Sequence, residues 1–180
     1  MSNTDSNSDF NMGFLTVLEV DGFGSCGGLL VVNQIGRPVE FHCTAPVSAN
    51  RTQEILYGGS LQSFLYCDQI GKTLTNQSKS KLNLIVTDQT TLIGLETTPD
   101  QILVLLVDKD EVDQLQSELK GAHRLEMDLK SGTIPFVFTQ DVSQLARVKN
   151  QLELFSRTLP LDEPFERIEC AIDEAQSVAR

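Results

Sequence analysis

Alternating apolar and polar residues predict β-strands along the first part of the chain. Residues 13–20 predict a first strand, and residues 28–44 predict a β-hairpin whose turn, 33–38, contains Asn, Gly and Pro. The second arm of the hairpin places two sets of side chains on opposite faces: Val39, Phe41 and Cys43 on one, and Glu40, His42 and Thr44 on the other. The hairpin therefore has a core side and a side that faces water, a partner or a ligand.

The hydrophobic period changes to that of a helix after Pro46. Apolar residues at helical spacing predict a long helix over about 51–77, and Asn50 and Gln53 have the spacing of a capping box at its start. Gly58 and Gly59 interrupt this helix, so we expect a kink or two consecutive segments there.

The rest of the chain predicts strands followed by two closing helices. The expected elements are a meander of strands at 82–87, 91–96 and 102–108, a helix between Asp110 and Gly121, strands at 123–130 and 133–139, and helices at 141–157 and 162–179. Pro135 lacks a backbone donor and predicts that the last strand lies at a sheet edge or contains a bulge.

Together these elements predict an α+β protein with a predominantly antiparallel sheet, covered by the long central helix and two C-terminal helices. Residues 1–12 are rich in Ser, Asn and Asp and predict a disordered tail. We expect residues 13–139 to form the sheet domain. Residues 140–180 are expected to form a helical pair that packs on this domain or on a partner.

Charge and cysteine usage narrow the possible environment. The chain has 14 basic and 25 acidic residues, a net charge of −11, and no basic cluster, so neither nucleic acid nor a membrane is expected as a partner. The N-terminal segment lacks the apolar region of a signal peptide. We therefore expect a soluble cytoplasmic protein with four reduced cysteines: Cys26, Cys43, Cys67 and Cys170.

Three motifs suggest chemistry but lack the context that it requires. Residues 22–27 match G-x-G-x-x-G, but a strand follows them, so we interpret them as a Gly-rich loop rather than a dinucleotide site. Adjacent His42 and Cys43 point to opposite sides of a strand and cannot hold one metal ion, although a thiol pair of Cys26 with His42 stays open. Acidic residues 108–113 fail the EF-hand pattern and suit a helix start, which leaves only an incidental Mg²⁺ or Ca²⁺ site. No cofactor is expected.

The order of elements over residues 14–120 resembles that of roadblock/longin and profilin-like sheets, and this implies an interaction or dimerisation module. We therefore expect a non-enzymatic module that binds a protein partner or forms a homodimer or other homo-oligomer. The alternatives are a small-molecule sensor, with its pocket between the first sheet and helix 57–66, and a small thiol-dependent enzyme. The candidate functional residues are Cys26, Arg37, His42, Cys43 and Tyr57, and the candidate interface residues are Phe165, Ile168, Ile172 and Val178.

Overall fold

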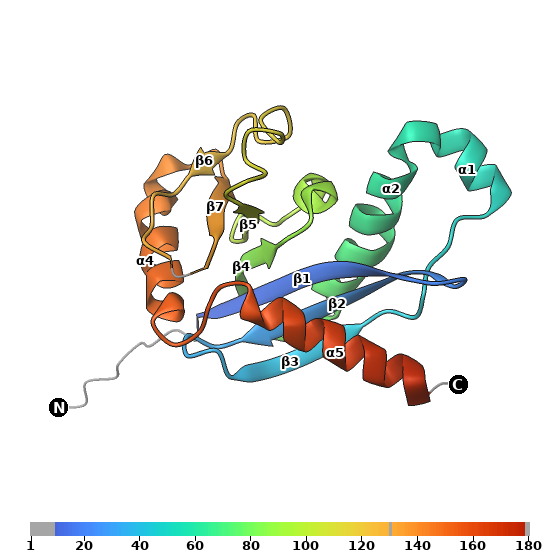
Figure 1. Ribbon diagram of the computed structural model, residues 1–180, viewed down its shortest axis with the longest axis horizontal. Coiled ribbons are helices and arrows are strands. Elements are labelled where there is room, and N and C mark those ends of the chain that lie inside the picture. Colours follow the sequence, from blue (N-terminus) through green and yellow to red (C-terminus); the bar gives the residue numbers. More distant parts are fainter. Residues whose placement is uncertain (1–9, 130, 179–180) are drawn as a thin grey trace.

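Seven strands form one mixed sheet in the computed structural model, which describes residues 10–129 and 131–178 (Figure 1). The strand order is β3-β2-β1-β4-β5-β7-β6. Four of the six strand pairings are antiparallel, whereas β1–β4 and β4–β5 are parallel. The strands are β1 (Asn11–Val20), β2 (Gly24–Val32), β3 (Pro38–Cys43), β4 (Leu82–Thr87), β5 (Ile102–Asp108), β6 (His123–Arg124) and β7 (Thr133–Phe138). The predicted α+β class is confirmed.

The long helix forms where the sequence predicts it, as a run of short segments. These are α1 (Arg51–Tyr57), η1 (Gly58–Ser60), α2 (Leu61–Ser63), the π-helical η2 (Phe64–Gly71) and α3 (Lys72–Gln77). Asn50 Oδ1 accepts the Gln53 backbone N–H at 2.9 Å, and the Gln53 side chain accepts the Asn50 N–H at 3.0 Å, so the capping box is present. Gly58 ends α1 with a φ of 50°, a conformation that favours glycine.

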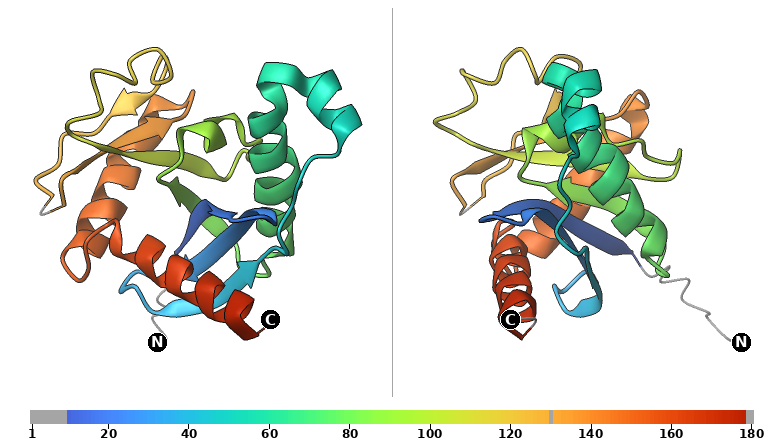
Figure 2. Two further views of the ribbon diagram at one scale, coloured as in Figure 1. Left: turned by 45° about the vertical axis from the view of Figure 1, so that its right-hand side comes forward. Right: turned by 90° about the vertical axis from the view of Figure 1, so that its right-hand side faces the viewer.

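Helices cover both faces of the sheet (Figure 2). The long helix and the short η3 (Thr90–Gly94) pack on one face, where Ile70, Leu74 and Leu92 are fully buried. On the other face η4 (Val142–Gln144) leads into α4 (Leu145–Ser156), which packs there with α5 (Glu163–Val178). Phe14 of β1 lies between the rings of Phe155 and Phe165, with both centroids 5.5 Å away. No helix in the described ranges is long and apolar enough to cross a membrane.

Two neighbouring glycines in β2 allow the helices to approach the sheet closely. A Cβ atom on Gly27 would collide with Ile70 of the long helix, and one on Gly28 would collide with Ile168 of α5. Successive strand residues point to opposite faces, so each glycine serves one helical layer. The predicted Gly-rich loop is therefore shorter than expected, because Gly24 and both of these glycines belong to the strand.

Two elements of the predicted meander differ in the structure. Residues 91–96 form no strand, because η3 turns Leu92 and Leu95 into the core against the long helix. β4 and β5 consequently run parallel. The segment 110–121 forms consecutive turns rather than a helix, with Val112, Leu115 and Leu119 packed against β5 and β7. Residues 82–121 thus contain neither the predicted meander nor the predicted helix, and the element order on which the resemblance to roadblock/longin and profilin-like sheets is based is wrong.

Several predicted boundaries and faces also need correction. Asn11 and Met12 belong to β1 rather than to a tail, and residues 1–9 lie outside the described residues. The strand expected at 123–130 is reduced to β6, which forms the edge of the sheet and pairs with residues 136–137 of β7. Pro135 therefore lies in the strand next to the edge, where it pairs with Leu106 of β5. On β3 the apolar residues Val39 and Phe41 are exposed, whereas Glu40 and His42 on the other face are half-buried.

The packing of α5 on Gly28 gives a stability prediction. Gly28→Val should lower the free energy of unfolding by about 1–3 kcal/mol, because the new side chain must displace Ile168 and Ile172. Urea denaturation measures this difference. Gly132→Val is the matched control, since an added Cβ there meets nothing within 4 Å, and it should change stability by less than about 0.5 kcal/mol. Equal effects of the two substitutions would contradict the packing argument.

Candidate active site

A cleft of about 380 Å³ lies where the parallel strands β1, β4 and β5 reach their carboxyl ends. The strands form its floor, and α5 and the turns after β5 form its walls. Open sheets with parallel strands commonly bind ligands at this edge. Six of the lining residues are acidic: Asp88, Asp108, Glu111, Asp162, Glu166 and Glu169.

The parallel register brings Thr16 and Asp88 together. Leu15 of β1 pairs with Thr87 of β4, so the next residue of each strand lies at the same level. Thr16 is buried, and its hydroxyl hydrogen-bonds the Asp88 carboxyl and accepts the Gln89 side-chain amide at 3.4 Å. These contacts hold Asp88 at the floor of the cleft.

The pKa of the Asp88 carboxyl is raised above its ordinary value. Burial of the carboxyl among protein atoms is the largest cause, and the negative charge of Glu169 adds to it. The hydrogen bond from Thr16 opposes this shift by stabilising the ionised form. The Asp88 side chain is nevertheless exposed at the edge of the cleft, so solvent reaches a carboxyl whose pKa its surroundings raise.

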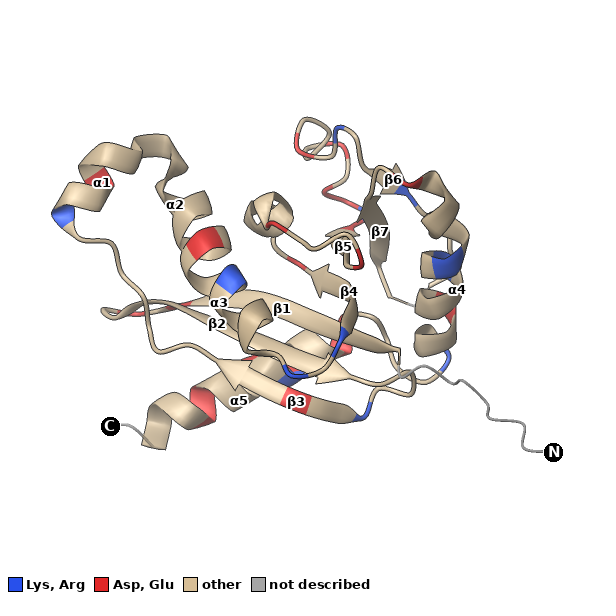
Figure 3. Cartoon of the chain, turned by 180° about the vertical axis from the view of Figure 1, so that it is seen from behind, with Lys and Arg blue, Asp and Glu red and all other residues tan. Residues whose placement is uncertain are grey.

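The cleft carries uncompensated negative charge. No ion pair joins any of its six carboxylates to a described Lys, Arg or His. Figure 3 shows the basic residues scattered singly over several elements. A second hollow shares Leu18 and Glu169 with the cleft and continues along α5 past Asp173, so the negative surface forms an extended groove.

The carboxylates do not form a metal centre. Within residues 10–129 and 131–178, no group of three or more His, Cys, Asp or Glu side chains could hold a metal ion. Metal-dependent hydrolysis uses carboxylates that converge on the ion. The described carboxylates do not converge in this way, and they can still exchange protons with a bound molecule.

The candidate residues on the hairpin lie outside the cleft. Leu29, rather than Cys26, pairs with His42, so the register does not create the considered thiol pair. The Cys26 Sγ donates to the Thr44 carbonyl at 2.9 Å, and Cys43 is exposed. His42 Nε2 instead lies 2.8 Å from a Glu40 carboxylate oxygen.

Glu40 forms several polar contacts on β3. Besides His42, its carboxylate accepts the backbone N–H of Lys79 at 3.0 Å and that of Ser80 at 2.6 Å, and the Ser80 hydroxyl also donates to it. These hydrogen bonds, of which the one with His42 has the largest effect, lower the pKa of Glu40 to about 2. They attach β3 to the chain segment after α3.

The other candidates are dispersed. Arg37 is exposed in the hairpin turn, and the ring of Tyr57 stacks on Phe64 with centroids 3.9 Å apart. Of the candidate interface residues, Phe165, Ile168 and Ile172 are buried against the chain's own sheet, whereas Val178 is exposed. Only Phe165 among all of these lines the cleft.

Sequence analysis missed Thr16 and Asp88. One signal was available, because Asp88 directly follows a buried strand and such residues meet at the carboxyl edge of a parallel sheet. The expected meander concealed it, since an antiparallel neighbour would have placed Asp88 in an ordinary turn.

No family model and no curated protein matches the chain. The solved structures that are similar to the chain, all three of the following at low identity, include human and Ciona intestinalis proteins. A structure of human ENDOV has 11% identity and a TM-score of 0.43, covering 94% of this chain and 87% of that chain. Ciona intestinalis endonuclease V was solved with a 23mer and with a 24mer DNA, each with an inosine followed by a ribo-adenosine. These have 11% and 12% identity and TM-scores of 0.40 and 0.37, and each alignment covers 81% of this chain and 78% of that chain.

These matches contradict three expectations from the sequence. The similar structures are of an endonuclease, two of them with DNA, whereas we expected a non-enzymatic interaction module, a protein partner or second copy, and no nucleic acid. Those predictions are corrected and withdrawn. TM-scores of 0.37 to 0.43 assign neither an activity nor a DNA ligand to this chain, so its function must be argued from its own residues.

Thiol exposure provides a direct check on the cysteine environments. All four cysteines are free, with Cys43 and Cys170 exposed and the other two buried. Burial raises the pKa of Cys26 and of Cys67 and also shields their sulfur atoms. Ellman's reagent should therefore modify two thiols in the native protein and four in denaturant. Fast modification of all four in the native protein would contradict these positions.

The opposite pKa shifts of Asp88 and Glu40 predict opposite effects on stability. A raised pKa means that the folded state disfavours the ionised form, so Asp88→Asn should raise Tm at pH 7. That gain should vanish as the pH falls below about 3.9, the ordinary Asp pKa. Glu40 has a lowered pKa, so Glu40→Gln should lower Tm at pH 7, and this loss should vanish as the pH falls toward 2. Thermal scans between pH 3 and pH 8 test both, and parallel curves for the two variants would contradict the assignment.

Proposed function

We propose that this chain is a hydrolase that works in the acidic cleft, with the Asp88 carboxyl as its general acid. The raised pKa of this carboxyl in a solvent-accessible cleft carries the proposal. A carboxyl with an ordinary pKa is almost fully ionised at neutral pH and has no proton to donate. A raised pKa brings the protonated form closer to the working pH, as general acid catalysis requires.

The position of Asp88 in the sheet supports this role. β2 and β3 extend the sheet on one side of β1, and β4 and β5 extend it on the other. Ligands bind to open sheets outside the carboxyl ends of the strands, at the point where the strand order changes sides. Thr16 and Asp88 lie at that point, between β1 and β4.

Two carboxyls in different surroundings each carry out one of the two proton transfers. Asp88 is held toward its protonated form, and the exposed Glu169 is close enough for its charge to act on Asp88. The described lining has no Cys, His, Lys or Ser, and its two Thr hydroxyls, Thr16 and Thr133, are already hydrogen-bonded, so we assign water as the nucleophile. Glu169 takes a proton from the attacking water, and Asp88 gives its proton to the leaving group as that bond breaks. Solvent then carries the proton from Glu169 back to Asp88.

The negative groove favours positive charge at the reacting end of the substrate. The substrate itself can carry this charge, or a divalent ion can accompany an anionic substrate such as DNA. The length of the groove along α5 suits an extended substrate.

A cytoplasmic location also remains a proposal. Four free cysteines suit a reducing compartment, where thiols persist without pairing. Acid–base chemistry by carboxyls requires no redox partner and is compatible with that compartment.

Two substrates test the proposed hydrolase activity. They also show whether the positive charge in the groove comes from the substrate itself or from a divalent ion. Lysine p-nitroanilide is offered without metal, and a 24mer DNA with an inosine, as in one similar structure, is offered with Mg²⁺. The wild type should hydrolyse one of them, and Asp88→Asn should lower kcat about 100-fold or more. Asp68→Asn makes the same change at an exposed position on η2, across the sheet, and should keep the wild-type rate.

Loss of fold does not explain the expected effect, because Asp88→Asn should be the more stable protein at pH 7. Failure of the wild type on both substrates, or wild-type rates for Asp88→Asn, would contradict the proposed function. Hydrolysis of the DNA only when Mg²⁺ is present would show that the counter-ion supplies the charge.

A further inference from the structure

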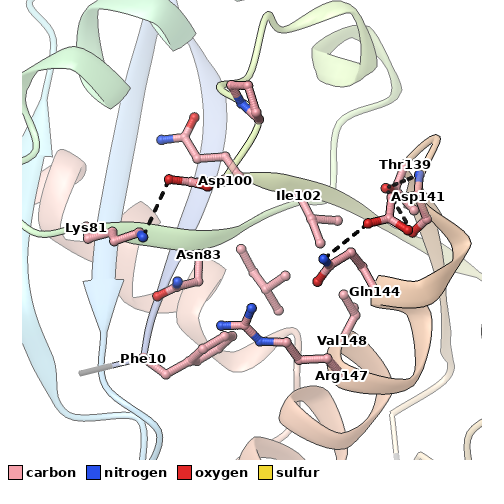
Figure 4. A pocket seen from close by; sticks show the side chains of 13 residues that line it. Phe10, Lys81, Asn83, Asp100, Ile102, Thr139, Asp141, Gln144, Arg147 and Val148 are labelled. Atoms are coloured by element: carbon pink, nitrogen blue, oxygen red, sulfur yellow. Dashed lines mark hydrogen bonds and ion pairs between the residues drawn. The ribbon is translucent and has the colours of Figure 1, made fainter. Parts of the chain in front are cut away.

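A second pocket lies at the opposite end of the parallel strands. It has a volume of about 160 Å³ and shares no lining residue with the acidic cleft. The start of β4, the loop before β5, the first turns of α4 and Phe10 form its walls. Figure 4 shows Lys81 and Asn83 on one side of the hollow, Gln144 and Val148 on the other, and the Arg147 guanidinium between them beside Phe10.

The acidic residues of this pocket are already compensated. Asp100 lies 3.5 Å from the Lys81 ammonium. Asp141 accepts the backbone N–H of Ser143 at 3.0 Å and its hydroxyl at 2.6 Å, and these bonds lower the pKa of Asp141. The Lys81 charge therefore offsets that of Asp100, whereas Asp141 stays ionised and is held by its hydrogen bonds at the start of η4.

Arg147 is left with unused hydrogen-bond donors. No hydrogen bond or ion pair joins its guanidinium to another described residue, and its closest recorded interaction is with the Phe10 ring, 5.8 Å from the centroid. A guanidinium has five N–H donors in a planar fork that matches the oxygens of carboxylate and phosphate. Stacking on an aromatic ring orients this fork without using its donors.

The amide side chains of the lining also present donors. Asn83 Oδ1 accepts the Asn11 backbone N–H at 3.3 Å, and Gln101 Oε1 accepts that of Thr98 at 3.1 Å. Both carbonyl oxygens are therefore engaged, and the NH₂ groups remain available. The pocket thus combines two amide donors with a guanidinium that pairs with no described residue.

From these contacts we infer that the pocket binds a small oxyanion of the phosphate class, with Arg147 as its principal ligand and Asn83 and Gln101 as additional donors. The volume of about 160 Å³ is well above the ~10–15 Å³ that a single water requires, which suits a free ion or the terminal group of a larger molecule. This site is independent of the proposed hydrolase, since its residues, charge and location differ.

Titration with inorganic phosphate tests the site on the full chain. Calorimetry and thermal shift should show saturable binding to the wild type, and sodium chloride at equal ionic strength should produce none. Arg147→Gln should weaken phosphate binding about tenfold or more, because it removes the charged fork. Arg157→Gln is the matched control: it removes the same charge from an exposed residue at the end of α4, outside the pocket, and should change Kd less than about twofold.

Two outcomes would overturn the inference of an oxyanion site. Equal responses to phosphate and chloride would show screening only, and equal weakening by both Arg variants would show an effect of net charge. Methyl phosphate extends the test, since tighter binding than that of inorganic phosphate would identify the terminal group of a larger ligand as the natural occupant. Because Arg147 is exposed on α4, Arg147→Gln should remain folded.

Discussion

The distance between the sheet and its two helical layers depends on Gly27 and Gly28 of β2. One faces the long helix and the other faces α5, and neither position has room for a Cβ atom. Glycine weakens an isolated strand because it has no side chain to pack. β2 persists because it pairs with β1 on one side and β3 on the other, and because isoleucines from both layers occupy the space above the glycines.

The close approach of α5 also creates the acidic cleft. Ile168 and Ile172 pack on Gly28, and the helical period then places Glu169 at the cleft beside the carboxyl ends of the strands. Full burial of each apolar side chain contributes about 1.5–3 kcal/mol, so these two isoleucines can hold α5 in place despite repulsion among the carboxylates. Burial is the largest cause of the raised pKa of Asp88, and the packing of α5 adds the smaller effect of the Glu169 charge.

Elements with local signals were predictable, and contacts between distant segments were not. The hairpin, the capping box at Asn50 and the break at Gly58 follow from residues within a few positions of one another. The parallel pairing of β4 with β1 has no local signal, because it depends on the helix that separates the strands and on the turn that replaces the strand expected at 91–96. The cleft depends on this pairing, so a correct α+β class still left Thr16 and Asp88 unnoticed.

Strand direction separates two kinds of chemistry along the same pair of strands. β4 has six residues, which span about 20 Å at ~3.3 Å each. Its carboxyl end leads to Asp88 in a cleft of uncompensated carboxylates, and its amino end adjoins the pocket where Arg147 is the uncompensated charge. This separation exceeds the Debye length of about 8 Å at physiological salt, so exposed charges at one end act only weakly on those at the other. An acidic chain can therefore present a local site for an anion, because Lys81 offsets the charge of Asp100 and hydrogen bonds from Ser143 occupy the Asp141 carboxylate.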